Sequence, residues 1–352
     1  MRLIPLKYPA LKLTLLSVMH FVTDGLCAYL IFAKLYPGNP EASFLIFLCY
    51  NILAFVTQSP VGMLIDKYNK PKIFLAVSMV SMLLGYLLSN FWILSVILIG
   101  ISNSLFHVAG GKYVTEKSGN DISHLGIFVS TGAIGLVVGQ RYLYLAPLPY
   151  VLLGLMIICG LLVIFCEDSE SLPSGEKYEG KIGESYALLI VLAVVLIRSF
   201  VGKVVSPDFT LSGHMFLVIA IATALGKAVG GILSKFIGIK LTTYISMVAA
   251  AICLTLGTFN TVLFVIGVFA FNFSMPITLY FANVIMKGKE GFAFGTLAAI
   301  LIPGYFLAMP FGYSTGIRIA VALMCAISVF LIVYISGKIK NNDTIITTDS
   351  IS

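Results

Sequence analysis

The sequence predicts an all-α integral membrane protein with twelve transmembrane helices in two six-helix bundles. Three observations lead to this fold class. Hydrophobic residues make up 59% of the 352 residues and charged residues 11%, whereas a soluble domain carries about a quarter charged residues. Apolar runs of roughly 20 residues, the length that crosses a bilayer, follow one another with short breaks. One longer polar connection divides these runs into two sets.

The breaks between the apolar runs lie at clusters of charged residues, Pro, Gly and Asn, and they define the expected spans to about four residues. The first residues are basic and lead into an apolar run with no small-residue cleavage site, so we expect a first span there and not a removed signal peptide. The runs are continuous, which excludes the short alternating strands of a β-barrel. The expected spans are 12–36, 42–65, 72–90, 92–113, 122–144, 147–166, 186–205, 210–234, 240–258, 260–286, 291–312 and 314–336.

The polar connection "EDSESLPSGEKYEGKIGES" divides the chain into four expected parts. Residues 1–166 form the N-terminal six-helix bundle, and residues 167–185 form a cytoplasmic linker. Residues 186–337 form the C-terminal six-helix bundle. Residues 338–352 are a polar cytoplasmic tail, which we expect to be disordered.

The distribution of Lys and Arg predicts the orientation of the protein, because cytoplasmic loops are enriched in both. With both termini in the cytoplasm, sixteen basic residues lie on the inner side and four on the outer side. We therefore expect a multi-pass protein of the cytoplasmic (inner) membrane, and the net charge of +7 reflects this topology and not a nucleic-acid partner. The inner residues are Arg2, Lys7, Lys12, Lys67, Lys70, Lys72, Lys112, Lys117, Lys177, Lys181, Lys235, Lys240, Lys287, Lys289, Lys338 and Lys340, and the outer ones are Lys34, Arg141, Lys203 and Arg318.

An internal repeat links the two halves. "VGMLIDKYNKPK" at 61–72 and "VGGILSKFIGIK" at 229–240 share four residues at a spacing of 168 positions. Each copy lies at the inner end of the second span of its half. Internal duplication is typical of transporters in which two bundles enclose a substrate site near the bilayer midplane. The shared residues are Val61, Gly62, Lys67 and Lys72 in the first copy and Val229, Gly230, Lys235 and Lys240 in the second.

The first copy resembles the loop between the second and third helices of the major facilitator superfamily, G-x-x-x-D-[RK]-x-G-[RK]-[RK]. Gly62, Asp66, Lys67 and Lys70 occupy the matching positions. Asn69 replaces the usual Gly, and Asn tolerates a positive φ better than most residues. "HFVTDG", "GISNSLFHVAGG", "IRSFVG" and "SHLGIFVSTGAIGLVVGQ" resemble segments of fosmidomycin-resistance-type exporters within that superfamily. The resemblance covers essentially the whole chain. It implies the major facilitator fold and a proton-driven exporter in which helices one, four, seven and ten line the central cavity.

Two charged residues are expected at the same depth of the cavity. Asp24 and Arg198 each lie about twelve residues from the inner end of a span, which is roughly 18 Å at 1.5 Å per residue. We expect Asp24 to exchange a proton during transport, and an ion pair with Arg198 is the alternative. Arg198 is the first candidate for substrate binding, because a guanidinium holds a carboxylate or phosphonate in a bidentate manner. His20 lies one turn before Asp24 and is expected to adjust its proton affinity.

Further polar residues within the spans are substrate-binding candidates. His107 follows Asn103 by four residues, so the two share a helix face. His107 is expected to bind substrate or relay protons, or alternatively to hydrogen-bond a neighbouring helix. Lys227 adds positive charge to the cavity or binds carbonyl groups at the seam between the halves. Asn272 and Asn283 are weaker candidates, and the Pro276 between them is expected to break their helix.

The residues that match the superfamily loop have a conformational role in this interpretation. Asp66, together with Gly62, Lys67 and Lys70, is expected to form a latch in which the Asp66 carboxylate caps a helix of the other half and holds the outward-open state.

Several alternatives remain open from the sequence. The protein is expected to export a small organic anion or drug, but an importer or exchanger of an anionic metabolite fits the same residues, and a non-transporting sensor is a remote third possibility. No H-x-x-x-H or D-x-x-D pattern occurs in the spans, so we expect no enzyme, no cofactor and no metal site. The expected partners are a small-molecule substrate, protons and the lipid bilayer, and the chain is expected to be a monomer.

Overall fold

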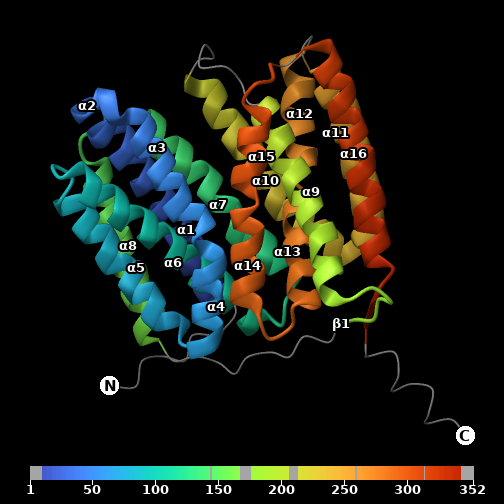
Figure 1. Ribbon diagram of the computed structural model, residues 1–352, viewed down its shortest axis with the longest axis horizontal. Helices are drawn as coiled ribbons and strands as arrows, with labels where there is room; N and C mark the ends of the chain where they lie inside the picture. Colours follow the sequence, from blue (N-terminus) through green and yellow to red (C-terminus); the bar gives the residue numbers. More distant parts are fainter. Residues whose placement is uncertain are drawn as a thin grey trace, which may run out of the picture.

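The computed structural model describes residues 10–142, 145–166, 176–205, 213–257, 260–312 and 314–341. Within these residues the protein is helical except for one two-stranded ribbon. The helices of residues 10–166 lie on one side of the molecule and those of residues 184–336 on the other (Figure 1).

The described residues of the first half form eight α-helices and three short π- or 3₁₀-helical segments. They are α1 (Ala10–Tyr29), η1 (Leu30–Leu35), α2 (Tyr36–Gly38), η2 (Pro40–Ala42), α3 (Ser43–Asn51), η3 (Ile52–Val56), α4 (Gln58–Tyr68), α5 (Pro71–Leu87), α6 (Trp92–Ser118), α7 (Ile122–Arg141) and α8 (Leu148–Phe165). The rest of the chain contains β1 (Glu176–Tyr178), α9 (Glu184–Val204), α10 (Gly213–Ile237), α11 (Ile239–Leu256), α12 (Thr261–Phe271), α13 (Ser274–Ile285), α14 (Glu290–Ala299), α15 (Leu301–Ala308), α16 (Thr315–Ser336) and β2 (Ile339–Asn341).

Each of the twelve predicted spans coincides with a helical segment. In the part of the chain that the structure describes, eleven helical segments are long and apolar enough to cross a membrane. The remaining segment, Pro71–Leu87, is apolar but 17 residues long. The largest difference is at the fourth span, which was expected to end at residue 113 but continues to Ser118, because Gly119 provides the left-handed residue that ends the helix. The boundaries of the two six-helix bundles remain predictions.

Two local signals act as the sequence predicted. Asn69 ends α4 in the left-handed conformation, with φ of 49°, so the turn survives without the usual glycine. The tenth span is interrupted at Asn272 and Phe273, between α12 and α13. The pyrrolidine ring of Pro276 clashes with the carbonyl four residues earlier, which is that of Asn272, and this explains why the break precedes the proline.

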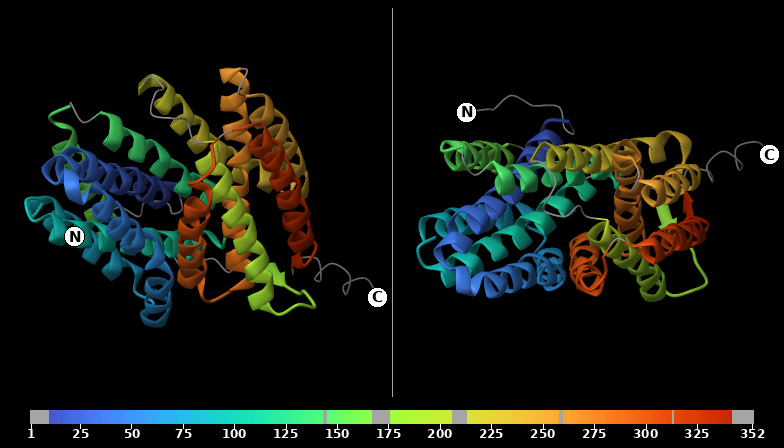
Figure 2. Two further views of the ribbon diagram at one scale, coloured as in Figure 1. Left: turned by 45° about the horizontal axis from the view of Figure 1, so that its top comes forward. Right: turned by 90° about the horizontal axis from the view of Figure 1, so that it is seen from above.

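Glycines on α7 allow two close helix contacts. Gly132, Gly135 and Gly139 lie against α1, and a Cβ atom at any of them would overlap α1 atoms. Gly126 lies against the backbone of α10 near Gly231. Small residues let helix backbones approach closely. As a result α7 packs on α1 in its own half and on α10 in the other half (Figure 2).

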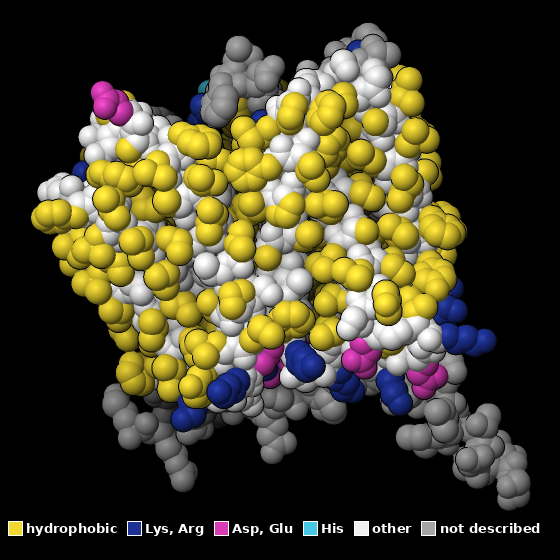
Figure 3. All heavy atoms as spheres, in the orientation of Figure 1, with side chains coloured by type: hydrophobic (Ala, Val, Ile, Leu, Met, Phe, Trp, Pro, Cys, Tyr) yellow, Lys and Arg dark blue, Asp and Glu magenta, His cyan; other side chains and the backbone are white. Residues whose placement is uncertain are grey.

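The outer surface has the polarity expected of a bilayer-embedded protein. Hydrophobic side chains cover most of the visible face, and Lys, Arg, Asp and Glu gather along one edge (Figure 3). We call this end of the molecule the basic edge; it carries the exposed Lys67, Lys70, Lys235 and Lys240. It corresponds to the side that the sequence analysis predicted to be cytoplasmic.

The linker and the tail contain a small sheet that the sequence did not predict. Strand β1 pairs antiparallel with β2, with Lys177 opposite Lys340. The expected tail is therefore ordered at residues 339–341, because its backbone groups find hydrogen-bond partners in the linker. Residues 167–175 of the linker and 342–352 of the tail lie outside the described residues, as do Arg2 and Lys7.

Candidate functional site

A cavity of about 150 Å³ lies between the two halves. Side chains from α1, α6, α9 and α13 line it, which are the first, fourth, seventh and tenth predicted spans. Helices α4, α7, α10 and α14 also contribute, so the wall is broader than the family resemblance implied. Most lining residues are apolar. The polar and charged ones are His20, Asp24, Gln58, His107, Arg198, Lys227 and Thr278, of which Gln58 and Thr278 were not predicted.

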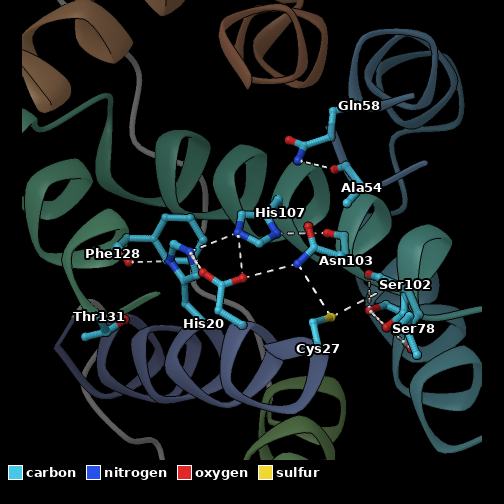
Figure 4. A network of polar contacts seen from close by, with 12 residues as sticks. His20, Cys27, Ala54, Gln58, Ser78, Ser102, Asn103, His107, Phe128 and Thr131 are labelled. Atoms are coloured by element: carbon cyan, nitrogen blue, oxygen red, sulfur yellow. Dashed lines mark hydrogen bonds and ion pairs between the residues drawn. The ribbon is translucent and has the colours of Figure 1, made fainter. Parts of the chain in front are cut away.

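Three ionisable side chains from the first half converge on one wall of the cavity. The Asp24 carboxylate lies 3.4 Å from His20 Nε2 and 3.5 Å from His107 Nε2. The two Nε2 atoms are 2.9 Å apart. His20 and Asp24 are one turn apart on α1, whereas His107 comes from α6. Figure 4 shows the His20 and His107 rings pointing toward each other, with Asn103 beside them.

Backbone carbonyl groups fix both imidazole rings. His20 Nδ1 lies 2.8 Å from the Phe128 carbonyl oxygen, and His107 Nδ1 lies 2.9 Å from the Asn103 carbonyl oxygen (Figure 4). A carbonyl oxygen accepts hydrogen bonds only, so each Nδ1 carries the hydrogen and donates it. In the neutral rings both Nε2 atoms therefore present a lone pair to the cavity wall.

The second half contributes two cations to the same cavity. Arg198 from α9 is 9% exposed, and Lys227 comes from α10. Neither side chain forms an ion pair with a described residue. The ion pair between Asp24 and Arg198, which was the alternative expected from the sequence, is absent between these two described residues. Asp24 is instead surrounded by His20, His107 and Asn103, which lie on the same half and reach it without crossing the cavity.

Three predicted substrate-binding residues do not line the cavity. The Asn103 amide donates to Asp24 Oδ1 at 3.1 Å, so it supports the carboxylate from behind. Asn272 donates to the Val268 carbonyl at the break between α12 and α13. Asn283 is buried and donates to Thr115 Oγ1 and Asn120 Oδ1 near the basic edge. Helix rotation places these three side chains on packed faces, which the residue type alone did not reveal.

Asp66 joins the two halves at the basic edge. Its carboxylate accepts hydrogen bonds from the backbone N–H groups of Gly291, at 2.9 Å, and Phe292, at 2.8 Å. These groups are the free donors at the start of α14, where a negative charge also interacts favourably with the helix dipole. Gly62 brings α4 close enough for this contact, since a Cβ there would overlap the Gly291 carbonyl. Lys67 and Lys70 are exposed and do not take part.

Lys112 is also part of this junction, although the sequence did not predict it. The Lys112 ammonium lies 3.1 Å from Asp66, 2.6 Å from Glu116 and 3.6 Å from Glu290, and the residue is 2% exposed. It was counted only as a marker of topology. The K-x-x-x-E spacing of Lys112 and Glu116 was the available signal, because residues four apart face each other on a helix.

A second polar link crosses the basic edge between Asp121 and Lys235. Asp121 caps the start of α7 by accepting from Ser123, and its other oxygen accepts a hydrogen bond from Lys235 at the end of α10. Burial of Asp121 acts to raise the pKa of its carboxyl, but the hydrogen bonds from Lys235 and Ser123 outweigh burial and lower the pKa.

Comparison with known proteins identifies the fold. No protein-family model matches the sequence, and no curated protein matches it. Solved structures do match. The E. coli fucose:proton symporter FucP aligns with a TM-score of 0.66 and 12% identity, over 93% of this chain and 98% of that chain. A structure of FucP in the outward conformation also aligns with a TM-score of 0.66 and 12% identity, over 93% of this chain and 99% of that chain. The human organic anion transporter MFSD10 (TETRAN) aligns with a TM-score of 0.64 and 14% identity, over 92% of this chain and 100% of that chain.

These similarities show that the chain has the fold of the major facilitator superfamily transporters. Together with the eleven long apolar helices among the described residues, this fold supports a multi-pass membrane protein. The fosmidomycin-resistance subgroup remains a prediction of the sequence segments quoted above.

Proposed function

We propose that the protein is a secondary active transporter that moves a small organic anion or drug across the cytoplasmic membrane by alternating access, in proton-coupled export. The observation that carries this proposal is the pair of cations in the cavity wall. Arg198 and Lys227 line the cavity and form no ion pair with a described residue. An uncompensated buried charge is costly, so an anionic ligand that reaches both side chains is stabilised by them.

The apolar part of the cavity wall favours an organic ligand over a small inorganic ion. Phe55, Met275 and Leu297 line the same space as the two cations. Small-molecule sites are mostly apolar, with a few polar groups that fix the orientation of the ligand. One structural neighbour is an organic anion transporter, which agrees with this substrate class.

Proton coupling is assigned in this proposal to Asp24 and His20. Both line the cavity, and a carboxylate and an imidazole are side chains that can take up and release a proton. His107 contacts both groups, so of the roles expected for it we propose the relay of protons. Another structural neighbour is a proton symporter, which agrees with proton coupling and leaves import or exchange of an anionic metabolite as the alternative direction.

Alternating access requires the basic edge to open. In the structure this edge is held by Asp66 at the start of α14 and by the Asp121–Lys235 link. The opposite side of the seam is held by aromatic contacts, such as Phe47 of α3 with Tyr305 and Phe306 of α15. We propose that the Asp66 latch stabilises the outward-open state and breaks as the inner side opens.

The substrate class is tested by thermal unfolding of the purified protein against a panel of small anions, cations and neutral drugs. A ligand at a hundred times its Kd stabilises the folded state by about 2.7 kcal/mol. Anions should stabilise the wild type and Arg198→Lys more than Arg198→Ala. Lys34→Ala removes an exposed charge outside the cavity and should respond as the wild type does. Equal stabilisation of wild type and Arg198→Ala by anions would contradict the proposal.

Direction and coupling are tested in proteoliposomes with the anion found in that screen. An imposed proton gradient should drive accumulation in the wild type. Asp24→Asn should abolish gradient-driven movement and retain exchange of substrate. A variant with the pH dependence of the wild type would show that Asp24 does not carry the proton. A non-transporting sensor would bind the ligand and show no flux.

A further inference from the structure

We infer that His20, Asp24 and His107 form a binding site for a divalent first-row transition-metal ion in the wall of the cavity. The sequence analysis expected no metal site, because the ligands come from two helices and form no recognisable motif. The inference does not depend on the transported substrate, since it concerns binding alone.

The first observation is the direction of the lone pairs. Each imidazole donates its Nδ1 hydrogen to a backbone carbonyl, His20 to Phe128 and His107 to Asn103. Metal-binding histidines characteristically donate the other ring N–H to a carbonyl or carboxylate, which fixes the tautomer and aims the free nitrogen at the ion. Both Nε2 atoms lie beside the Asp24 carboxylate and 2.9 Å from each other.

The second observation is the spacing of the three groups. Their potential ligand atoms all lie within 4.8 Å of one another. Zinc binds imidazole nitrogen and carboxylate oxygen at about 2.0–2.2 Å, so tetrahedral ligands are about 3.3 Å apart. Asp24 Oδ2 lies 3.4 Å from His20 Nε2 and Asp24 Oδ1 lies 3.5 Å from His107 Nε2, so each carboxylate oxygen is at about this distance from one of the two nitrogens. The two Nε2 atoms, at 2.9 Å, need to separate by about 0.4 Å.

The third observation is the space and support around the site. Gly132 of α7 lies directly beside it, and a Cβ atom there would overlap Asp24 Oδ2 and His20 Nε2. The absence of a side chain at Gly132 lets these two ligand atoms lie against α7. Asn103 holds Asp24 Oδ1 from the opposite side, as a supporting partner does for a carboxylate ligand. The cavity borders the site, so water or a ligand atom supplies the remaining coordination positions.

A metal ion explains the arrangement more fully than a proton does. In the neutral tautomers none of the three converging groups carries a hydrogen, so two lone pairs and a carboxylate repel one another. A single proton bridges only two of these atoms. One divalent ion bonds all three, and two imidazoles with one carboxylate form a ligand set that Zn²⁺, Co²⁺ and Fe²⁺ accept.

The charges around the site predict how the affinity changes in variants. Arg198 and Lys227 line the same cavity and repel a bound cation. We therefore expect Lys227→Ala to bind the ion more tightly than the wild type. The same substitution removes a cation that the proposed anion requires, so anion binding and metal binding change in opposite directions. This contrast separates the failure of one proposal from the failure of the other.

The test is titration of the purified full-length protein with Co²⁺, followed by its visible absorption, and competition by Zn²⁺. The wild type should bind one Co²⁺ per chain with histidine-type absorption that Zn²⁺ abolishes. His20→Ala, His107→Ala and Asp24→Asn should each weaken binding at least tenfold. Asp24→Asn keeps the shape of the side chain and so limits misfolding. Gly132→Ala keeps all three ligand residues, but its Cβ overlaps the Asp24 and His20 ligand atoms and should also weaken binding.

The matched control is His214→Ala, which removes an exposed histidine outside the cavity. It should bind Co²⁺ as the wild type does. The inference is overturned if the folded wild type binds no Co²⁺, or if the three ligand variants bind as tightly as the wild type. In the first case the three groups hold a proton, as the proposed function alone requires.

Discussion

The junction between Asp66 and α14 leads to a quantitative prediction for Asp66→Asn. The carboxylate accepts from two backbone N–H groups, of Gly291 and Phe292, and its side chain is 10% exposed. An Asn side chain has one acceptor oxygen, so its NH₂ group faces one of these donors. Hydrogen bonds to a charged group contribute about 1.5–3 kcal/mol each. Losing one of them weakens the closed basic edge by about 2 kcal/mol, or about 30-fold in the opening equilibrium.

Hydrogen–deuterium exchange measures this change at the site itself. The amides of Gly291 and Phe292 exchange when the basic edge opens, and their rates report the free energy of that opening. We expect the peptide that contains the start of α14 to exchange about 30-fold faster in Asp66→Asn. Lys240→Gln, which removes an exposed charge at the same edge, should leave the rate unchanged. A rate in Asp66→Asn equal to that of the wild type would refute the latch.

Three further predictions concern the basic edge. Lys112→Met leaves Asp66, Glu116 and Glu290 without their shared cation and should lower the free energy of unfolding in denaturant by about 3–5 kcal/mol. In the background of Asp66→Asn the same substitution should cost less, because one of the three carboxylates is already absent. Additive losses in the double variant would show that the charges are not coupled. Gly62→Ala should lower the transport rate and the Tm, because its Cβ overlaps the Gly291 carbonyl. Gly154→Ala has open space at its Cβ and should change neither. Equal effects of the two substitutions would contradict the packing argument. Because the pKa of Asp121 is lowered in the folded state, its stabilising effect is complete above about pH 4 and is lost as the pH falls through the folded-state pKa. Asp121→Asn should therefore flatten the curve of Tm against pH below about pH 4. An unchanged curve would exclude this link.

The sequence by itself determined the membrane-spanning helices and several local features. Hydropathy located the twelve helical segments, because a chain in a bilayer must satisfy its backbone hydrogen bonds within each apolar run. Asn69 was identified as the turn residue from its tolerance of positive φ, and Pro276 as the cause of the helix break. The i,i+4 spacing placed His20 and Asp24 on one face. These features depend on residues close in the chain, so the order of residues was sufficient.

Only the tertiary structure decided which side chains meet across helices. His107 was expected to bind substrate, relay protons or hydrogen-bond a neighbouring helix. It lines the cavity, and the rotation of α6 against α1 brings its Nε2 to within 2.9 Å of His20. Arg198 was considered as a partner of Asp24, but the cavity separates their helices. Lys112 carried no recognised signal until α4 and α14 packed beside it. Periodicity tells which residues share a face. The partner of that face depends on helix rotation and on close contacts such as that of Gly132, which the packing of the whole chain determines.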